Sequence, residues 1–250
     1  MSSSQKRFPR GEAAATLLVV AASPEDLARQ AAERMASAID RALSERDRAQ
    51  IALAGGETPA PAYARLGQEH LPWDRVDVLL GDERWVAPTD PASNLRMLRQ
   101  TLLGPGPGSS ACLHPVPTTD QPIPDASAEA YAALVEQLCS GFPPCFDLMV
   151  LGLGDDGHTA SLFPGTAAPA VTDRSVTIGE GKGLPRITLT APVLSAAREV
   201  IVLVSGAGKR QALGRLLDPL EPAERTPARL VQPRGDLVIL ADAAAAEGLL

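Results

Sequence analysis

Residues that could activate a water molecule lie together in one glycine-rich segment. Residues 152–158 read Gly-Leu-Gly-Asp-Asp-Gly-His and follow an apolar run at residues 146–151. A histidine at the end of a strand, two residues after a carboxylate, is placed to act as a general base with an orienting acid beside it. His158 and Asp156 are therefore candidate catalytic residues. A histidine that is only hydrogen-bonded within its own loop is the alternative that this segment leaves open.

The same segment matches the pattern GxGxxG, which raises the question of a dinucleotide site. Asp155 and Asp156 stand where a pyrophosphate would approach the backbone, and Pro164-Gly165 cuts short any helix that begins here. This is not the context of the nicotinamide fingerprint, in which the glycines open a helix. The pattern therefore gives little support to a dinucleotide-dependent oxidoreductase.

A second turn, Gly55-Gly56-Glu57-Thr58-Pro59, is suited to binding an anion. Its two glycines let the backbone approach a ligand, and exposed amides at the start of a following helix favour phosphate. The hydroxyl of Thr58 adds a donor, whereas the carboxylate of Glu57 must point away. An ordinary strand-to-helix turn explains the same residues equally well.

Two cationic residues follow other predicted strands. Arg84 ends the segment Gly81-Asp82-Glu83-Arg84, and an arginine there can hold a phosphate with two parallel hydrogen bonds. Lys209 ends Ser205-Gly206-Ala207-Gly208-Lys209 and opens a predicted helix, where its point charge can serve a phosphate. The alternatives are a solvated run of charges for Arg84 and an ordinary surface lysine for Lys209.

Several other chemistries are disfavoured. The histidines are His70, His114 and His158, which are far apart and form no HExxH zinc motif, and the GxSxG serine-hydrolase motif is absent. Three cysteines fit no disulfide framework and no CxxC pattern, which favours a reducing, cytoplasmic setting. Cys145 precedes an apolar run and is expected to pack in the core rather than act as a nucleophile.

Composition limits the class of protein. The 250 residues include 23 basic and 30 acidic ones, for a net charge of −7, and 45% are hydrophobic. This content is typical of a globular protein, and the acidic balance disfavours nucleic-acid binding. No apolar run reaches the roughly 18–20 residues of a membrane span. Lys6, Arg7 and Arg10 before the apolar run at residues 13–22 resemble a short secretory signal, but a buried strand over residues 16–21 is favoured.

The elements that must position these residues alternate along the chain. Ser23-Pro24-Glu25-Asp26 predicts a helix start, and an apolar stripe of four-residue spacing continues to Leu43. Further helices are predicted after Thr58-Pro59, from Ser93 to Leu103, up to about Ser140, over 209–217 and after 240. Buried strands are predicted at 16–21, 51–54, 76–80, 146–151, 200–205 and 237–240, with shorter ones at 175–178 and 186–190 and a loop at 104–125.

This alternation predicts an α/β fold with a doubly wound, mostly parallel sheet and helices on both faces. Ligands bind such sheets beyond the carboxyl ends of the strands, where the glycine-rich turns lie. We expect a single domain over residues 12–250 and a loose tail over residues 1–11.

The segments, taken in order, resemble the 6-phosphogluconolactonase family, within the superfamily of glucosamine/galactosamine-6-phosphate isomerases. The resemblance covers about residues 12–247. It rests on Gly81-Asp82-Glu83-Arg84 with Ser93-Asn94, on residues 156–165, which read Asp-Gly-His-Thr-Ala-Ser-Leu-Phe-Pro-Gly, on residues 186–190, and on Gly206 with Lys209. The related glucosamine-6-phosphate deaminases share the fold and the Asp-Gly-His turn. They differ at Arg84, where tyrosine is expected, and in the Ser161–Pro164 segment.

The resemblance implies a Rossmann-like fold of the deaminase type and hydrolysis of 6-phospho-D-glucono-1,5-lactone, without metal or cofactor. It implies that His158 activates water and that Asp156 orients the imidazole, with turn amides near Gly154 and Gly157 as candidate oxyanion donors. The phosphate would be held by three residues of the turn after the second strand, Gly55, Gly56 and Thr58. Three cations would also hold it: Arg84, Lys209 and Arg186. The family usually carries serine at the position of Glu57, so a side-chain role there is in doubt.

Other functions remain as alternatives. A sugar-phosphate isomerase–deaminase would release ammonia, a non-catalytic sugar-phosphate sensor would keep its response without His158, and an oxidoreductase would bind a nicotinamide cofactor. The expected partner is a small sugar-phosphate lactone, with neither nucleic acid nor membrane. A monomer is expected, and weak self-association stays open.

Overall fold

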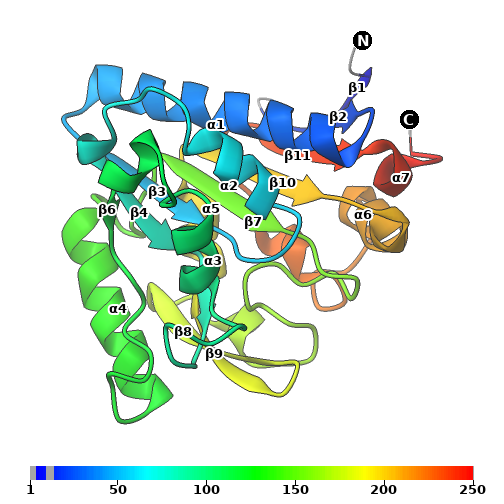
Figure 1. The fold of residues 1–250 in the computed structure, drawn as a ribbon. Coiled ribbons are helices and arrows are strands. Elements are labelled where there is room, and N and C mark those ends of the chain that lie inside the picture. The colour runs from blue at the N-terminus through cyan, green and yellow to red at the C-terminus, as the bar shows by residue number, and fades with distance from the viewer. Residues whose placement is uncertain (1–3, 10–13, 250) are drawn as a thin grey trace.

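The computed structural model describes residues 4–9 and 14–249, and within them the chain builds two sheets. The large sheet has eight strands in the order β1-β2-β11-β10-β7-β3-β4-β6, and all its neighbours are parallel except β1 and β2. In Figure 1, α1 and α2 lie along the upper side of this sheet, and α4 and the small sheet lie below it. The predicted α/β class with a mostly parallel sheet is confirmed.

The strands of the large sheet are β1 (Ser4–Pro9), β2 (Ala15–Ala21), β3 (Ala49–Leu53), β4 (Val76–Leu80), β6 (Cys112–Leu113), β7 (Leu148–Gly152), β10 (Glu199–Val204) and β11 (Leu237–Asp242). The small sheet holds β5 (Asp82–Arg84), β8 (Val176–Gly181) and β9 (Leu184–Leu189). The helices are α1 (Pro24–Glu45), α2 (Ala60–Leu66), α3 (Asn94–Gln100), α4 (Pro124–Leu138), α5 (Ala191–Ala196), α6 (Arg210–Leu217) and α7 (Ala243–Ala246).

The longest helix, α1, begins as its sequence predicts. The Ser23 hydroxyl accepts a hydrogen bond from the Asp26 amide at 3.2 Å, Pro24 is the first helical residue, and Glu25 lies in the same turn. This cap satisfies an amide that the helix itself leaves without a partner. The predicted stripe from Leu27 to Leu43 is buried against β2, β3, β7 and β11, so α1 covers the middle of the sheet.

The order of the strands reverses between β3 and β7. From β3 the chain continues to β4 and β6 on one side, whereas from β7 it continues to β10 and β11 on the other. Connections that leave two neighbouring parallel strands in opposite directions open a crevice at the carboxyl ends of those strands. The turns at Gly55-Gly56 and at residues 152–158 follow β3 and β7, so they lie at this crevice.

The small sheet is a feature that the sequence analysis did not predict as a separate unit. β5 pairs antiparallel with β9, and β8 pairs antiparallel with β9 through the two-residue turn Lys182-Gly183. Both turn residues have positive φ, 54° and 79°, as the tight hairpin turns that match strand twist require. The strands predicted at 175–178 and 186–190 therefore form one hairpin that lies over the crevice.

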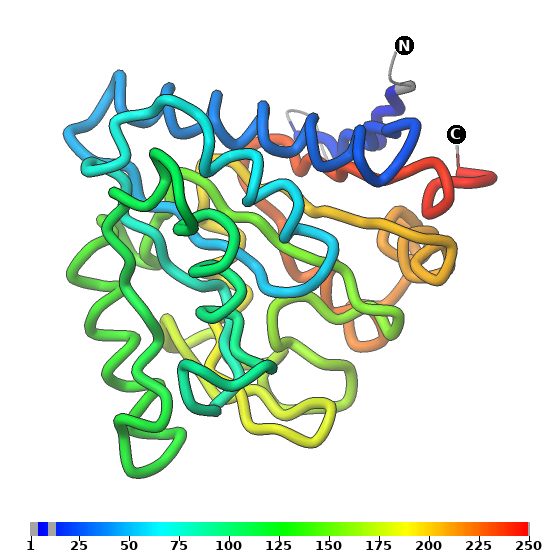
Figure 2. Tube along the Cα trace, viewed as in Figure 1, coloured from blue at the N-terminus to red at the C-terminus, as the bar shows by residue number. Residues whose placement is uncertain are grey.

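Several boundaries differ from the prediction. Residues 4–9 of the expected loose tail form β1, which pairs with β2. Residues 1–3, 10 and 11 of that tail lie outside the described residues. Figure 2 shows β1, in dark blue, on the same side of the molecule as the red C-terminal end of the chain, and Lys6 donates a hydrogen bond to the Leu249 carbonyl at 3.1 Å. The run that resembled a secretory signal is an internal strand, β2, between β1 and β11.

Two predicted helix ends are also wrong. Thr58 does not cap α2, which begins at Ala60 after a turn and has no side-chain cap. Ser93 caps α3 as predicted, but this helix ends at Gln100 because Thr101 leaves the helical conformation. No helix in the described part of the chain is long and apolar enough to cross a membrane.

The edge of the large sheet near the crevice depends on one tyrosine. The Tyr131 hydroxyl donates to the Leu80 carbonyl at 2.7 Å and accepts from the Leu80 amide at 3.0 Å, and both residues are fully buried. β6 pairs with β4 only at Asp77 and Val78, so it does not reach Leu80. Tyr131 thus takes the place of a neighbouring strand directly before the Asp82–Arg84 segment.

We predict that Tyr131→Phe lowers the free energy of unfolding by about 1–3 kcal/mol, because a buried amide and a buried carbonyl lose their partner. Tyr63→Phe is the matched control, since its buried hydroxyl makes one hydrogen bond, to the Ala54 carbonyl at 3.0 Å. Urea denaturation of the two variants measures the difference. An equal loss in both variants would contradict the special role of Tyr131.

Candidate active site

A cavity of about 430 Å³ lies at the carboxyl ends of β3 and β7. Eight of the ten predicted site residues line it: Gly55, Gly56, Thr58, Arg84, Gly154, His158, Arg186 and Lys209. Asp156 contacts the His158 ring, and Gly157 lies in the same turn, but neither lines the cavity. Asp82, Asn94 and Lys182 also line it and were not predicted as site residues.

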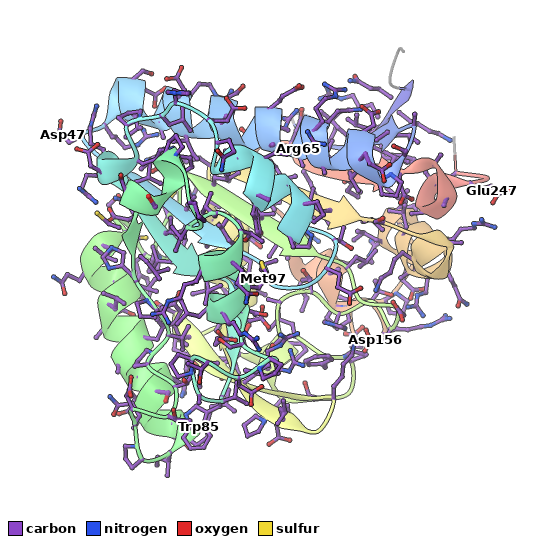
Figure 3. The ribbon with its side chains drawn as sticks, viewed as in Figure 1. Asp47, Arg65, Trp85, Met97, Asp156 and Glu247 are labelled. Atoms are coloured by element: carbon purple, nitrogen blue, oxygen red, sulfur yellow. The ribbon has the colours of Figure 1, made fainter. Side chains whose placement is uncertain are left out.

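The predicted histidine–carboxylate pair is present. His158 Nδ1 lies 2.5 Å from Asp156 Oδ1, and the same oxygen accepts the His158 amide at 3.0 Å. A carboxylate on Nδ1 selects the tautomer that carries its proton there, which leaves Nε2 as the basic atom. The other side of the ring packs on Phe163, with 4.2 Å between ring centroids. Figure 3 labels Asp156, which lies on the loop that follows β7.

Burial and charge act in opposite directions on this pair. Burial lowers the pKa of His158, and the hydrogen bond and charge of Asp156 raise it, with a net value below the ordinary 6.5. Burial raises the pKa of Asp156, but the His158 amide and ring outweigh it and hold that pKa below its ordinary value. Near neutral pH the pair therefore consists of a neutral imidazole and a carboxylate, which is the state that a general base needs.

The turn around His158 is closed by its own backbone. The Gly154 amide donates to the His158 carbonyl at 2.8 Å, and the Gly157 amide donates to the Gly154 carbonyl at 3.0 Å. Both amides that were predicted as oxyanion donors are thus engaged within the turn, and the arrangement does not support that prediction. The Gly157 carbonyl in turn accepts the Ala228 amide at 3.0 Å, which ties the turn to the connector before β11.

Gly154 is required by close approach to the pair. A Cβ at this position would lie 2.0 Å from His158 Nδ1 and 2.6 Å from Asp156 Oδ1. Such distances are far inside van der Waals contact, so any side chain here would displace the hydrogen bond that orients the imidazole. The glycine that the sequence analysis placed in a dinucleotide-like pattern serves instead to seat His158 and Asp156.

Arg84 is held in place by Asn94. Its Nη1 donates to the Asn94 Oδ1 at 2.8 Å and to the Ala92 carbonyl at 2.5 Å, while its buried Nε has no hydrogen-bond partner. Nδ2 of the Asn94 side chain also donates to the Asp82 carbonyl at 2.8 Å, and a Cβ on Gly55 would collide with Asn94 Oδ1. One buried asparagine therefore joins the arginine strand to the glycine turn after β3.

Glu83 fixes the same segment from behind. Its buried carboxylate accepts hydrogen bonds from the amides of Arg84, Asn94 and Leu95, each at 2.8 Å, and from the Ser93 hydroxyl at 3.0 Å. Burial raises the pKa of Glu83, and the four hydrogen bonds oppose that effect. In the charged run Asp82–Arg84, Glu83 is thus a buried anchor and not a solvated charge.

Two arginines face one another across the small sheet. Arg84 and Arg186 are register partners in the antiparallel β5–β9 pair, where like charges destabilise. Burial, more than the neighbouring Arg84 charge, lowers the pKa of Arg186. Asp82 offsets part of the repulsion, since its Oδ2 lies 3.7 Å from Arg186 Nη1 and accepts the Ser161 hydroxyl at 2.6 Å. The remaining positive charge faces the cavity and suits an anionic ligand.

The other residues that were predicted to contact phosphate also lie at the cavity. Lys209 lines the cavity but forms an ion pair with Asp155, and this pairing holds the pKa of Asp155 below its ordinary value. The Gly55-Gly56 turn reaches the cavity, and Gly56 has a φ of 108°, which glycine accommodates. Glu57 is exposed at the cavity rim. Among the described residues, no group of three or more potential ligands is placed to hold a metal ion.

Comparison with known proteins places this geometry in context. A family model described as glucosamine-6-phosphate isomerases/6-phosphogluconolactonase matches residues 22–240. A 6-phosphogluconolactonase from Synechocystis sp. is 45% identical over 214 residues, or 84% of this chain and 89% of the relative. The structure of the Trypanosoma brucei 6-phosphogluconolactonase aligns with a TM-score of 0.83 and 30% identity over 99% of this chain and 100% of the other. The structure of a 6-phosphogluconolactonase from Shewanella baltica OS155 aligns with a TM-score of 0.83 and 27% identity, over 91% of this chain and 98% of the other.

We predict that the pKa of His158 lies below 6.5 in the folded protein and falls further in Asp156→Asn, because burial remains while the charge that raises the pKa is lost. NMR titration of labelled imidazoles measures both values, and the His158→Gln variant assigns the signal among the three histidines. A higher His158 pKa in Asp156→Asn than in the unmodified protein would contradict this balance.

Proposed function

Because the chain belongs to the glucosamine-6-phosphate isomerase/6-phosphogluconolactonase family, we propose that it hydrolyses 6-phospho-D-glucono-1,5-lactone to 6-phospho-D-gluconate. The observation that carries the proposal is the His158–Asp156 pair at a cavity lined by four cationic side chains, namely Arg84, Lys182, Arg186 and Lys209. It is a carboxylic ester hydrolase of the oxidative pentose phosphate pathway, as the names of its relatives indicate.

His158 removes a proton from water as the water oxygen attacks the lactone carbonyl carbon. The new carbon–oxygen bond forms a tetrahedral oxyanion, and Nε2 of His158 carries the proton that the water has lost. Collapse of the oxyanion breaks the bond to the ring oxygen, and His158 returns the proton to that oxygen. The ring opens to a hydroxy acid, which loses its acidic proton to solvent at neutral pH. Asp156 keeps Nδ1 protonated throughout, so only Nε2 exchanges the proton.

The phosphate is held away from the reacting carbonyl. Arg84 and Arg186 supply guanidinium donors from adjacent strands, Lys209 supplies a point charge, and Gly55 and Gly56 line the same cavity. An anion between the two arginines would relieve their mutual repulsion, so binding and the local electrostatics favour each other. Binding energy from this remote group aligns the lactone for attack.

Hydrolysis is favoured over the isomerase–deaminase alternative by two features in and beside the cavity. Arg84 lines it where a deaminase is expected to carry tyrosine, and Ser161 of the lactonase-like segment is buried on Asp82. A coupled assay for ammonia tests the alternative directly. We further propose that the protein is a monomer and that it is cytoplasmic. The second proposal agrees with the three free cysteines of the described residues.

We predict that the protein accelerates disappearance of the lactone, generated in place by glucose-6-phosphate dehydrogenase, over the spontaneous reaction. His158→Ala should lower kcat by about 10²–10⁴-fold, because the general base is lost. His70→Ala is the matched control, since His70 is exposed and does not line the cavity. Full activity of a folded His158→Ala protein would overturn the role of His158, and no acceleration by the unmodified protein would overturn the function.

We predict that Arg84→Gln raises KM and the inhibition constant of inorganic phosphate by about tenfold, the effect of losing about 1.4 kcal/mol of binding. A charge-assisted hydrogen bond to phosphate supplies an energy of this order. Steady-state kinetics with added phosphate measure both constants. If Arg84→Gln lowers kcat and leaves the inhibition by phosphate unchanged, Arg84 does not hold the phosphate.

A further inference from the structure

The reaction needs a donor for the tetrahedral oxyanion, and the turn around His158 does not supply the expected one. The amides of Gly154 and Gly157 are both engaged within the turn. A developing negative charge in a partly enclosed cavity needs a positioned positive group or hydrogen-bond donor. The donor must therefore be a residue of the cavity wall whose charge is not already paired with another group of the protein.

Lys182 is such a cation. Its side chain lines the cavity that His158 lines, and it forms no hydrogen bond or ion pair with the described residues. Of the other three lining cations, Arg186 and Lys209 lie beside the carboxylates of Asp82 and Asp155. Arg84 has no anionic partner, but Asn94 holds its guanidinium, which the proposed function assigns to the phosphate. An ammonium without a protein partner at the wall of a substrate cavity is available to a group on the substrate.

The hairpin that carries Lys182 is fixed at its base, close to the catalytic histidine. A Cβ on Gly181 would lie 2.3 Å from the Phe163 ring, so the strand rests on this ring, and Arg186 Nε donates to the Gly181 carbonyl at 3.2 Å. Phe163 also packs on His158. The residue before Lys182 and the imidazole thus share one aromatic support.

Electrostatics agree with this position. The largest effect on the pKa of Asp155 is its hydrogen bond with Lys209, and the largest on Asp156 and His158 is burial. Beyond these effects, the charge of Lys182 lowers the pKa of all three groups. The ammonium of Lys182 therefore lies close enough to the turn around His158 to act on all three of these groups.

We propose that Lys182 is a catalytic residue that donates a hydrogen bond to the lactone carbonyl oxygen and stabilises the oxyanion formed when His158-activated water attacks. This inference rests on the proposed lactone hydrolysis. Lys182 forms no covalent bond and keeps its three protons. Its oxygen partner is neutral in the substrate, negatively charged in the tetrahedral intermediate and part of a carboxylate in the product. Lys182 therefore binds the intermediate and the product more strongly than the substrate.

The test compares Lys182→Met, which removes the charge but keeps the chain length, with Lys182→Arg, which keeps the charge. Lys6→Ala is the matched control for loss of one lysine, because Lys6 lies on β1 outside the cavity. Residue 182 has a positive φ of 54° in the hairpin turn, and both variants place another unbranched side chain there. The backbone strain of the turn is therefore unchanged. The measurements are kcat, KM and the inhibition constants of inorganic phosphate and of 6-phosphogluconate.

We expect Lys182→Met to lower kcat about 10–100-fold. This effect is no larger than that of removing an enclosed oxyanion donor, because Lys182 is exposed to solvent. KM and inhibition by inorganic phosphate should stay close to those of the unmodified protein, whereas the inhibition constant of 6-phosphogluconate should rise about fivefold. Lys182→Arg should recover part of kcat, and Lys6→Ala should change none of these constants.

Two results would overturn the inference and leave the proposed function standing. In the first, Lys182→Met weakens inhibition by inorganic phosphate and raises KM at unchanged kcat, which would make Lys182 a phosphate contact. In the second, Lys182→Met turns over the lactone as the unmodified protein does. Absence of turnover by the folded, unmodified protein would instead remove the proposed function, and this inference with it.

Discussion

The reversal of strand order between β3 and β7 is the constraint on which the site depends. Because these parallel neighbours send their connections in opposite directions, no crossover covers their carboxyl ends. The turn after β3 supplies Gly55 and Gly56, and the turn after β7 supplies His158. Residues about a hundred positions apart in the chain therefore line the same cavity. The small sheet then closes one side of the crevice and brings the arginines to it.

The site must also hold two positively charged side chains in a half-buried position before an anionic ligand binds. Arg84 and Arg186 lie opposite one another in β5 and β9, an arrangement that costs free energy on its own. Two buried carboxylates make it tolerable: Asp82 pairs with Arg186, and Glu83 uses its oxygens on backbone amides to lock the strand. Neither carboxylate forms an ion pair with Arg84, so a positive charge remains at the site, as the proposed binding of phosphate requires. The three charged residues of the run Asp82–Arg84 thus have different roles: Asp82 pairs with Arg186, Glu83 anchors the backbone, and Arg84 keeps its charge.

How far the sequence predicted the site follows from the range of each interaction. His158 and Asp156 are two residues apart, so their pairing is local and the turn pattern predicts it. Arg84 and Asn94 depend on a contact ten residues apart, which the motif indicates only through family resemblance. Lys182 reaches the cavity because β9 pairs with β5 across about a hundred residues, and no local pattern carries that pairing. The Lys-Gly pair between two short strands was the available signal, since it favours a two-residue hairpin.

The proposed catalytic base, His158, and the stability of the fold are linked through one proton. A histidine in the unfolded chain has a pKa of about 6.5, and burial lowers that of folded His158 below it. The unfolded chain therefore binds a proton more readily than the folded protein does in the interval between the two values. The contribution of His158 to stability is complete above the unfolded pKa and is lost as pH falls through the folded pKa. Protonation of His158 thus removes the base and also lowers the free energy of unfolding. Because Asp156 raises the pKa of folded His158 toward the unfolded value, it narrows the pH interval over which that stability is lost.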